Sequence, residues 1–238
     1  MKNSIIRKLL SAAVISSATV STNISAQNLS VTITNLTHGL AFTPALVAAH
    51  DTSGNLFDTG SAASANLQAM AEGGALSGLQ NDLDAITATH TSAGAPLMAG
   101  SSVTLTLNTD TAPANTKLSV VAMMLPTNDG FIGLDAADIP AAAGTYTFYL
   151  NAYDAGTEAN DELITGGGAP GVAGIPGDPG AMAGSGATGG VAGTDSNNNV
   201  HVHRGAIGDD DLSGGNSDLD NTVHRWLNPV ARVTLVVK

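Results

Sequence analysis

The sequence predicts an antiparallel all-β sandwich with one or two short helices. Apolar and hydroxyl residues alternate with a period of two in several segments, a pattern typical of strands with one buried face. Helix-forming sequence is confined to one region, whereas a parallel sheet would need a helix between successive strands. Turn-rich loops separate the strands, so we expect a single domain over residues 27–238.

The elements follow in order from the first alternating run. The predicted strands are 29–37, 40–50, 101–108, 117–125, 145–153 and 229–237, and the predicted helices are 61–71 and 75–85. Pro44 lacks an amide donor, so the second strand should be broken there or lie at a sheet edge. Gly73 and Gly74 should end the first helix. We expect the two helices to cap an end of the sheet.

Residues 1–26 have the features of a secretory signal peptide. Lys2, Arg7 and Lys8 precede an apolar stretch, and a small-residue triplet ends at Ala26. The stretch is too short and too polar for a membrane span. We therefore expect export, either to the periplasm or out of the cell. The absence of cysteine excludes a disulfide framework and a lipid-modified Cys.

The charge of the chain is strongly acidic. Its formal value is −12, and loss of residues 1–26 removes three of eight basic residues and none of twenty acidic ones, leaving −15. Such a field repels nucleic acid and anionic lipid and attracts cations. An acidic exported protein without cysteine favours calcium over thiolate-bound zinc, although solubility alone also accounts for the charge.

Two apolar runs, 118–135 and 144–158, each lead into an acidic, glycine-containing turn. Strands that end in this way deliver carboxylates to one end of a core, here Asp129, Asp154 and Glu158. Calcium takes about six to eight oxygen ligands, and a tight turn would direct the last two of these side chains toward one point. The alternative interpretation is that these are solvated turn acids.

A second acidic loop has the spacing of a calcium loop. Asp209, Asp211, Ser213, Gly214 and Asp220 stand at positions 1, 3, 5, 6 and 12 of that pattern. Position 12 is Asp instead of Glu, and no clear helices flank the loop. A solvated loop is the alternative.

The segment from 165 to 199, which we call the glycine-rich segment, has no apolar periodicity. Glycine recurs at every third position from 168 to 180. We interpret the segment as a long mobile surface insertion. Collagen-like trimerisation is the alternative, although five triplets are too few for a stable triple helix.

Catalytic motifs are missing from the sequence. No Gly-x-Ser-x-Gly elbow stands on a strand-to-helix turn, and the aromatic and basic residues needed for nucleic-acid binding are scarce. His201 and His203 would share one face of a short strand, and we interpret them as exposed histidines rather than a zinc site. We therefore predict that the protein is not an enzyme.

Three segments resemble the spondin N-terminal domain family, in the order in which that family has them. They are 56–74, with its Ala-Glu-x-Gly helix end, 126–135, similar to the family's Pro-Ser-Pro-Asp-Trp-Phe-x-Gly-x-Asp, and 153–158, similar to Tyr-Asp-Ala-Gly-Thr-Asp. The sequence departs from the family where Asn128 replaces Pro, Gly130 replaces Trp and Glu158 replaces Asp.

The resemblance implies an eight-stranded sandwich of the synaptotagmin-like calcium- and lipid-binding type. It also implies calcium (Ca2+) at one end of the domain, with ligands at Asp129, Asp154 and Glu158, and a role in binding an extracellular protein or glycan rather than in catalysis. Two alternatives remain open: a hydrolase that uses paired carboxylates, and calcium-dependent membrane docking, which the negative charge opposes.

Overall fold

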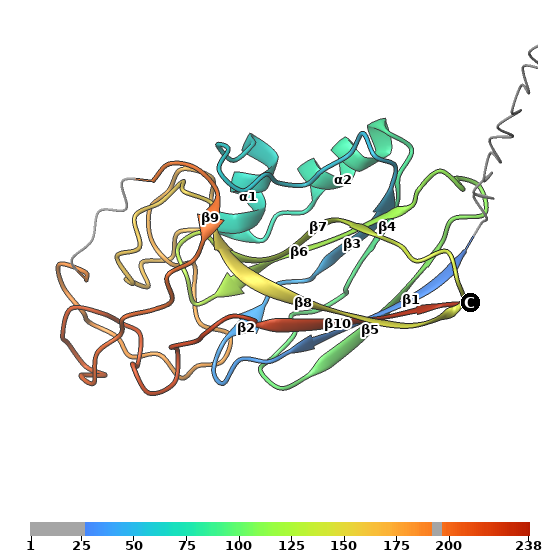
Figure 1. Cartoon of the computed structure of the whole chain (residues 1–238). Coiled ribbons are helices and arrows are strands. Elements are labelled where there is room, and N and C mark those ends of the chain that lie inside the picture. The colour runs from blue at the N-terminus through green and yellow to red at the C-terminus, as the bar shows by residue number, and fades with distance from the viewer. Residues whose placement is uncertain (1–26, 192–196) are drawn as a thin grey trace, which may run out of the picture.

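The protein is described by a computed structural model over residues 27–191 and 197–238 (Figure 1). The predicted signal peptide, 1–26, lies outside these residues. Within them there are ten strands and two helices. The strands are β1 (Asn28–Asn35), β2 (Ala41–Phe42), β3 (Leu46–His50), β4 (Thr89–Ser92), β5 (Ser102–Asn108), β6 (Lys117–Leu125), β7 (Gly130–Asp138), β8 (Gly144–Asp154), β9 (His201–Val202) and β10 (Ala231–Val237). The helices are α1 (Ala65–Gly73) and α2 (Ser77–Ala85).

The strands form one continuous, strongly curved antiparallel sheet in the order β4-β3-β6-β7-β8-β10-β1-β5. The long strand β8 turns the corner between two layers, because residues 144–150 pair with β10 and residues 151–154 pair with β7. Edge strands β4 and β5 lie in contact, so the sandwich is nearly closed. The prediction of an antiparallel all-β fold is confirmed. The synaptotagmin-like type stays a prediction.

Most predicted strands are present, and their burial follows the period of two. In β1, Leu29, Val31 and Ile33 point into the core between the layers, while the hydroxyl residues between them lie on the outer face. The predicted strand 40–50 is broken around Pro44 into β2 and β3, as the missing amide donor requires. The sequence did not predict β4 or β7.

The helices differ from their predicted place. Instead of capping an end of the sheet, they cover the outer face of β3 and β6 (Figure 1). The reason lies in β6, which is apolar at successive positions: Val120 and Ala122 face the core between the layers, while Val121 and Met123 face the helices. A strand buried on both faces needs a covering layer on each.

The helices end where the sequence predicts. The hydroxyl of Ser64 accepts a hydrogen bond from the Leu67 amide and caps α1. Gly74 follows in the left-handed region with φ 70°, which a residue with a side chain adopts at a cost. The helix thereby presents Leu67 and Met70 to the sheet, where both are buried.

A β-bulge interrupts the pairing of β6 with β7. Ser119 alone faces two residues of β7, Asp135 and Ala136, and Ala136 has φ 47°. The Ser119 hydroxyl accepts a hydrogen bond from the Ala136 amide at 2.9 Å and lies 2.7 Å from Nε2 of His50 on β3. Both His50 and Ser119 are fully buried, so a polar contact spans three strands within the sheet.

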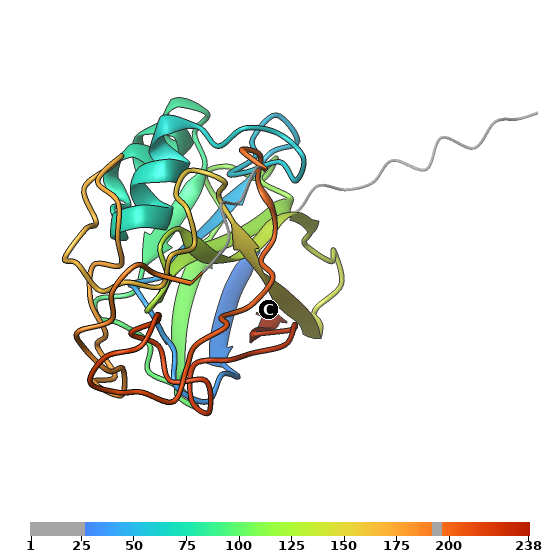
Figure 2. The same ribbon diagram turned by 90° about the vertical axis from the view of Figure 1, so that its left-hand side faces the viewer.

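Irregular segments gather at one end of the sandwich. Residues 155–191, together with 203–229, lie at the end opposite the C-terminus (Figure 1) and cover that end when it is viewed directly (Figure 2). Nowhere in 27–191 or 197–238 is there a helix long and apolar enough to span a membrane.

Candidate functional site

The predicted carboxylates Asp129 and Asp154 lie side by side at this covered end. Asp129 immediately precedes β7 and Asp154 ends β8, and the register of these strands places Gly130 opposite Asp154. The Ala155 amide also donates to the Asp129 carbonyl at 3.2 Å. Neither side chain is exposed to solvent, so two carboxylates are buried next to each other.

The two oxygens of Asp129 have different surroundings. Oδ2 accepts from the Thr157 amide at 2.7 Å, the Thr157 hydroxyl at 3.1 Å and the Glu158 amide at 3.1 Å. Oδ1 is buried and has no hydrogen-bond partner within the described chain. Burial, and then the neighbouring charge of Asp154, raises the pKa of Asp129 to about 6.

Asp154 organises the turn that follows β8. Its Oδ1 accepts from the Gly156 amide at 2.8 Å, and Gly156 has φ 70°, which the turn requires. Its Oδ2 accepts from Nδ2 of Asn160 at 2.7 Å and lies 3.9 Å from Nε2 of both His201 and His203. The side chain of Asp154 therefore links the turn after β8 to β9 and to His203.

Glu158 is half-buried beside this pair. Its Oε2 accepts from the Gly174 amide at 3.1 Å, while Oε1 is buried without a hydrogen-bond partner among the residues described. Burial raises the pKa of Glu158 to about 7, and the charges of Glu72 and Asp129 add to the effect. Asp129 and Glu158 thus each have one carboxylate oxygen that accepts no hydrogen bond from the described residues.

These carboxylates offer the oxygen atoms that a cation prefers, but their side chains are not arranged as a metal site. Over the described residues, no three His, Asp or Glu side chains converge tightly enough to hold a metal ion. Asp129 and Glu158 nevertheless each keep one buried oxygen without a hydrogen-bond partner among the described residues, and burial raises the pKa of both carboxyls. Carboxylate oxygens are the ligand type that calcium prefers, so the donor atoms match this ion in chemistry.

The glycine-rich segment is attached to the same end by two carboxylates. Glu72, fully buried on α1, accepts from the Gly171 amide at 2.6 Å, and Glu158 holds Gly174 as described above. Gly168, Gly171 and Gly174 have φ of 101°, 77° and 111°, whereas collagen requires values near −75°. This geometry opposes the collagen-like alternative, and the predicted mobility stays a prediction.

The second acidic loop is held together by its own backbone. Asp209 accepts from the amides of Asp211, Asn216 and Ser217, and these hydrogen bonds hold its pKa below the usual value. The left-handed residue is Gly215, at position 7, and not Gly214 at position 6. Asp211 and Asp220 likewise accept from Ser213 and Thr222. Calcium binding by this loop stays a prediction.

Sequence reasoning missed Glu162, a buried carboxylate in an unusual conformation. Glu162 has φ 61°, and it accepts from the Ile207 amide at 2.6 Å, the Gly208 amide at 2.8 Å and the Ser217 hydroxyl at 2.6 Å. It therefore fixes the loop before β10 to the site. It carries no periodic or spacing signal, because all its partners are distant in sequence.

The interpretation of the histidines as exposed was wrong for His203. Its side chain is 6 % exposed, and its ring centroid lies 5.0 Å from that of Trp226. A Cβ added at Gly130 would lie 2.7 Å from Thr127 Oγ1 and 3.2 Å from His203 Cδ2. The space beside Gly130, where the family has Trp, is thus filled by this chain's own side chains.

The fold and the site define an antiparallel all-β domain with buried carboxylates at one covered end. The family model Spondin_N matches residues 33–162, more than half of the chain, and the chain belongs to the spondin N-terminal domain family. Domains of this family are extracellular in general, in agreement with the expected export. No curated protein matches the sequence at a significant level.

Proposed function

We propose that this protein is an exported, non-enzymatic, calcium-binding module that attaches to an extracellular protein or glycan. The observation that carries the calcium proposal is the pair of buried, unpaired oxygens, Asp129 Oδ1 and Glu158 Oε1. An anionic oxygen without a partner is costly in a protein interior, and a hard divalent cation is the ligand that oxygens of this kind prefer.

Asp129, Asp154 and Glu158 would hold the ion. Bound calcium would neutralise the repulsion between these side chains and join the turn before β7 to the turn after β8. Asn128 supports the same arrangement, because its Nδ2 donates to Asp161 Oδ1 at 2.9 Å and lies 3.5 Å from Glu158 Oε2. The attachment role rests on the family and on the expected export.

Burial and charge repulsion account for the raised pKa values without catalysis. Desolvation is the largest cause for both Asp129 and Glu158, and neither residue lines the three cavities described in the protein. A glycosidase would need a cleft beside its carboxylate pair. The binding role is therefore better supported than the hydrolase alternative.

Isothermal titration with calcium tests the proposal. We expect a dissociation constant of about 10⁻⁴–10⁻³ M, the range of extracellular modules, with weaker binding of magnesium. Asp129→Asn and Asp154→Asn should each abolish the heat of binding, whereas Asp110→Asn, which removes an exposed charge elsewhere, should not. Absence of binding at about 10 mM calcium would contradict the proposal. Binding to immobilised glycans and matrix proteins, with and without calcium, then identifies the partner.

A further inference from the structure

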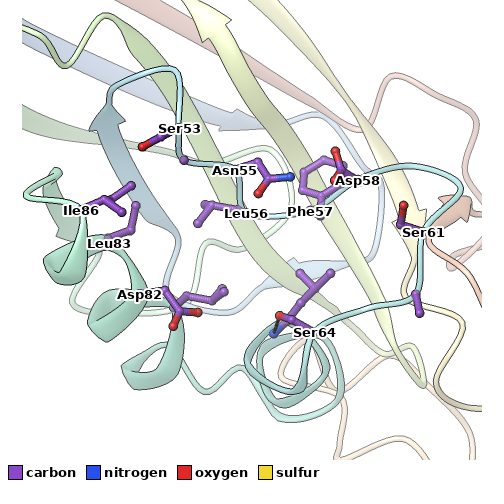
Figure 3. A pocket seen from close by; sticks show the side chains of 14 residues that line it. Ser53, Asn55, Leu56, Phe57, Asp58, Ser61, Ser64, Asp82, Leu83 and Ile86 are labelled. Atoms are coloured by element: carbon purple, nitrogen blue, oxygen red, sulfur yellow. Dashed lines mark hydrogen bonds between the residues drawn. The ribbon is translucent and has the colours of Figure 1, made fainter.

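A second site lies on the helical side of the domain, in a groove of about 360 Å³ between the loop that follows β3 and the two helices (Figure 3). This volume falls at the lower end of the range of ligand sites. The loop contributes residues 53–58, 61, 62 and 64, and α1 and α2 contribute the opposite wall. The groove is lined by the first of the three family-like segments, which the proposed calcium site does not use.

The loop wall of the groove is fixed in place. The Leu56 amide donates to Asp135 Oδ1 at 2.6 Å, and the Gly60 amide donates to the Val200 carbonyl at 2.8 Å. The ring of Phe57 packs against Phe131 with a centroid distance of 5.2 Å. Because both ends of the loop are hydrogen-bonded and its aromatic residue is packed, the groove is formed before any ligand arrives.

The chemistry of the groove is amphipathic and acidic. Its floor consists of buried apolar side chains: Leu56, Phe57, Leu67, Leu79 and Leu83. Asp58 on the loop and Asp82 on α2 stand at its rim, and Figure 3 shows them on opposite walls. Asn66 Nδ2 donates to Asp82 Oδ2 at 2.7 Å and orients that carboxylate. Among the described residues that line the groove, none is basic.

We propose that this groove binds a Lys or Arg side chain of a partner polypeptide, together with an apolar side chain next to it. Lys and Arg bury an aliphatic stem on an apolar surface and keep the charged head in water, which matches an apolar floor with carboxylates at the rim. The charge of the chain favours a cationic ligand over an anionic one. The volume accommodates about two side chains, so one basic residue and one apolar neighbour fill it.

This proposal goes beyond calcium binding and does not depend on it. Ser64, which caps α1, and Leu67 in its first turn belong to the groove, whereas Glu72 in the last turn of α1 lies near the carboxylate site. The interaction should therefore occur in EDTA. A failure of calcium binding and a failure of this groove give separate results.

Fluorescence anisotropy in EDTA tests the proposal with a labelled, N-acetylated peptide that contains Leu-Arg-Leu between Gly-Ser flanks. We expect saturable binding below about 1 mM, with a weaker response from a peptide in which Ser replaces both Leu residues. Asp58→Asn and Asp82→Asn should each weaken binding by about two- to five-fold, the effect of one partly exposed ion pair. Asp110→Asn, matched in charge and outside the groove, should leave binding unchanged.

A blocking variant separates the groove from the rest of the acidic surface. Ala62 is exposed and lines the groove, so Ala62→Arg should place the protein's own guanidinium there and abolish peptide binding without lowering the thermal midpoint. Unchanged binding by this variant would overturn the proposal, as would the absence of saturation at about 1 mM peptide. Agmatine carries the guanidinium and aliphatic stem of arginine without a polypeptide backbone. If agmatine competes at the same concentrations as unlabelled peptide, then the site binds small guanidinium compounds rather than a polypeptide, and the proposal is overturned.

Discussion

Replacing Asp129 by Asn should change stability in opposite directions with and without calcium. The side chain is fully buried, and its pKa is raised from 3.8 to about 6 by burial and by Asp154. A shift of about two units means that the charged form costs on the order of 3 kcal/mol at pH 8 relative to an unperturbed carboxyl. Asn keeps the shape without the charge, and its oxygen can still accept from Thr157 and Glu158.

In EDTA at pH 8, Asp129→Asn should therefore raise the free energy of unfolding by about 1–3 kcal/mol. For a chain of this size, that corresponds to a rise of roughly 5 °C in the melting temperature. At 10 mM calcium the wild type should gain about 1.4–2.7 kcal/mol, given a dissociation constant of about 10⁻⁴–10⁻³ M, and the variant should gain nothing. Thermal melts followed by circular dichroism measure both effects.

Two results would refute this reasoning. If the variant melts below the wild type in EDTA, then burial of the Asp129 charge is not costly and the unpaired oxygen has no significance. If calcium stabilises the variant as much as the wild type, then Asp129 is not a ligand. Asp110→Asn serves as the control, because it removes an exposed charge and should change neither melt.

Two further predictions concern the pH dependence of stability and the buried carboxyl of Glu162. Because folding raises the pKa of Asp129 to about 6 and that of Glu158 to about 7, the folded protein binds more protons than the unfolded chain below these values. In EDTA the melting temperature should therefore rise as the pH falls from 8 to 5, and a fall would contradict the two shifts. Glu162→Gln should lower the free energy of unfolding by about 1–3 kcal/mol, because its amide would face the Ile207 or Gly208 donor. Denaturant titration would measure this loss, and an unchanged midpoint would mean that the loop does not depend on Glu162.

The sequence predicted those parts of the fold in which one face of a strand is buried. In β1, and in β10 as far as Leu235, a polar residue follows each apolar one, and that alternation is visible without a structure. β7 was missed because Gly130 and Gly133 weaken the strand signal, although Phe131 and Ile132 are fully buried. Burial of β6 on two faces was also missed, and with it the place of the helices.

The candidate site was predictable only as far as local sequence determines it. The sequence predicted that Asp129 and Asp154 lie at neighbouring strand ends. In the structure, pairing of β7 with β8 brings these two turns together. Glu162 and His203 reach the same end of the domain through loops without periodicity, and Glu72 reaches it from the end of α1, so no single spacing rule identifies the three residues. The tertiary arrangement of those loops, rather than any local pattern, determines which carboxylates become buried.

The Ser119 hydroxyl, which contacts both His50 and the bulge in β7, restricts how β6 can align with its neighbours. A strand that is apolar on both faces can slide by one residue and still bury apolar side chains, so hydrophobicity alone does not determine its partners. A slide of β6 would separate the Ser119 hydroxyl from His50 and from the Ala136 amide, leaving buried polar groups unpaired. The Ser119 hydroxyl, in the middle of an apolar strand, thereby favours one alignment of β3, β6 and β7. That alignment also determines where Asp129, just before β7, lies.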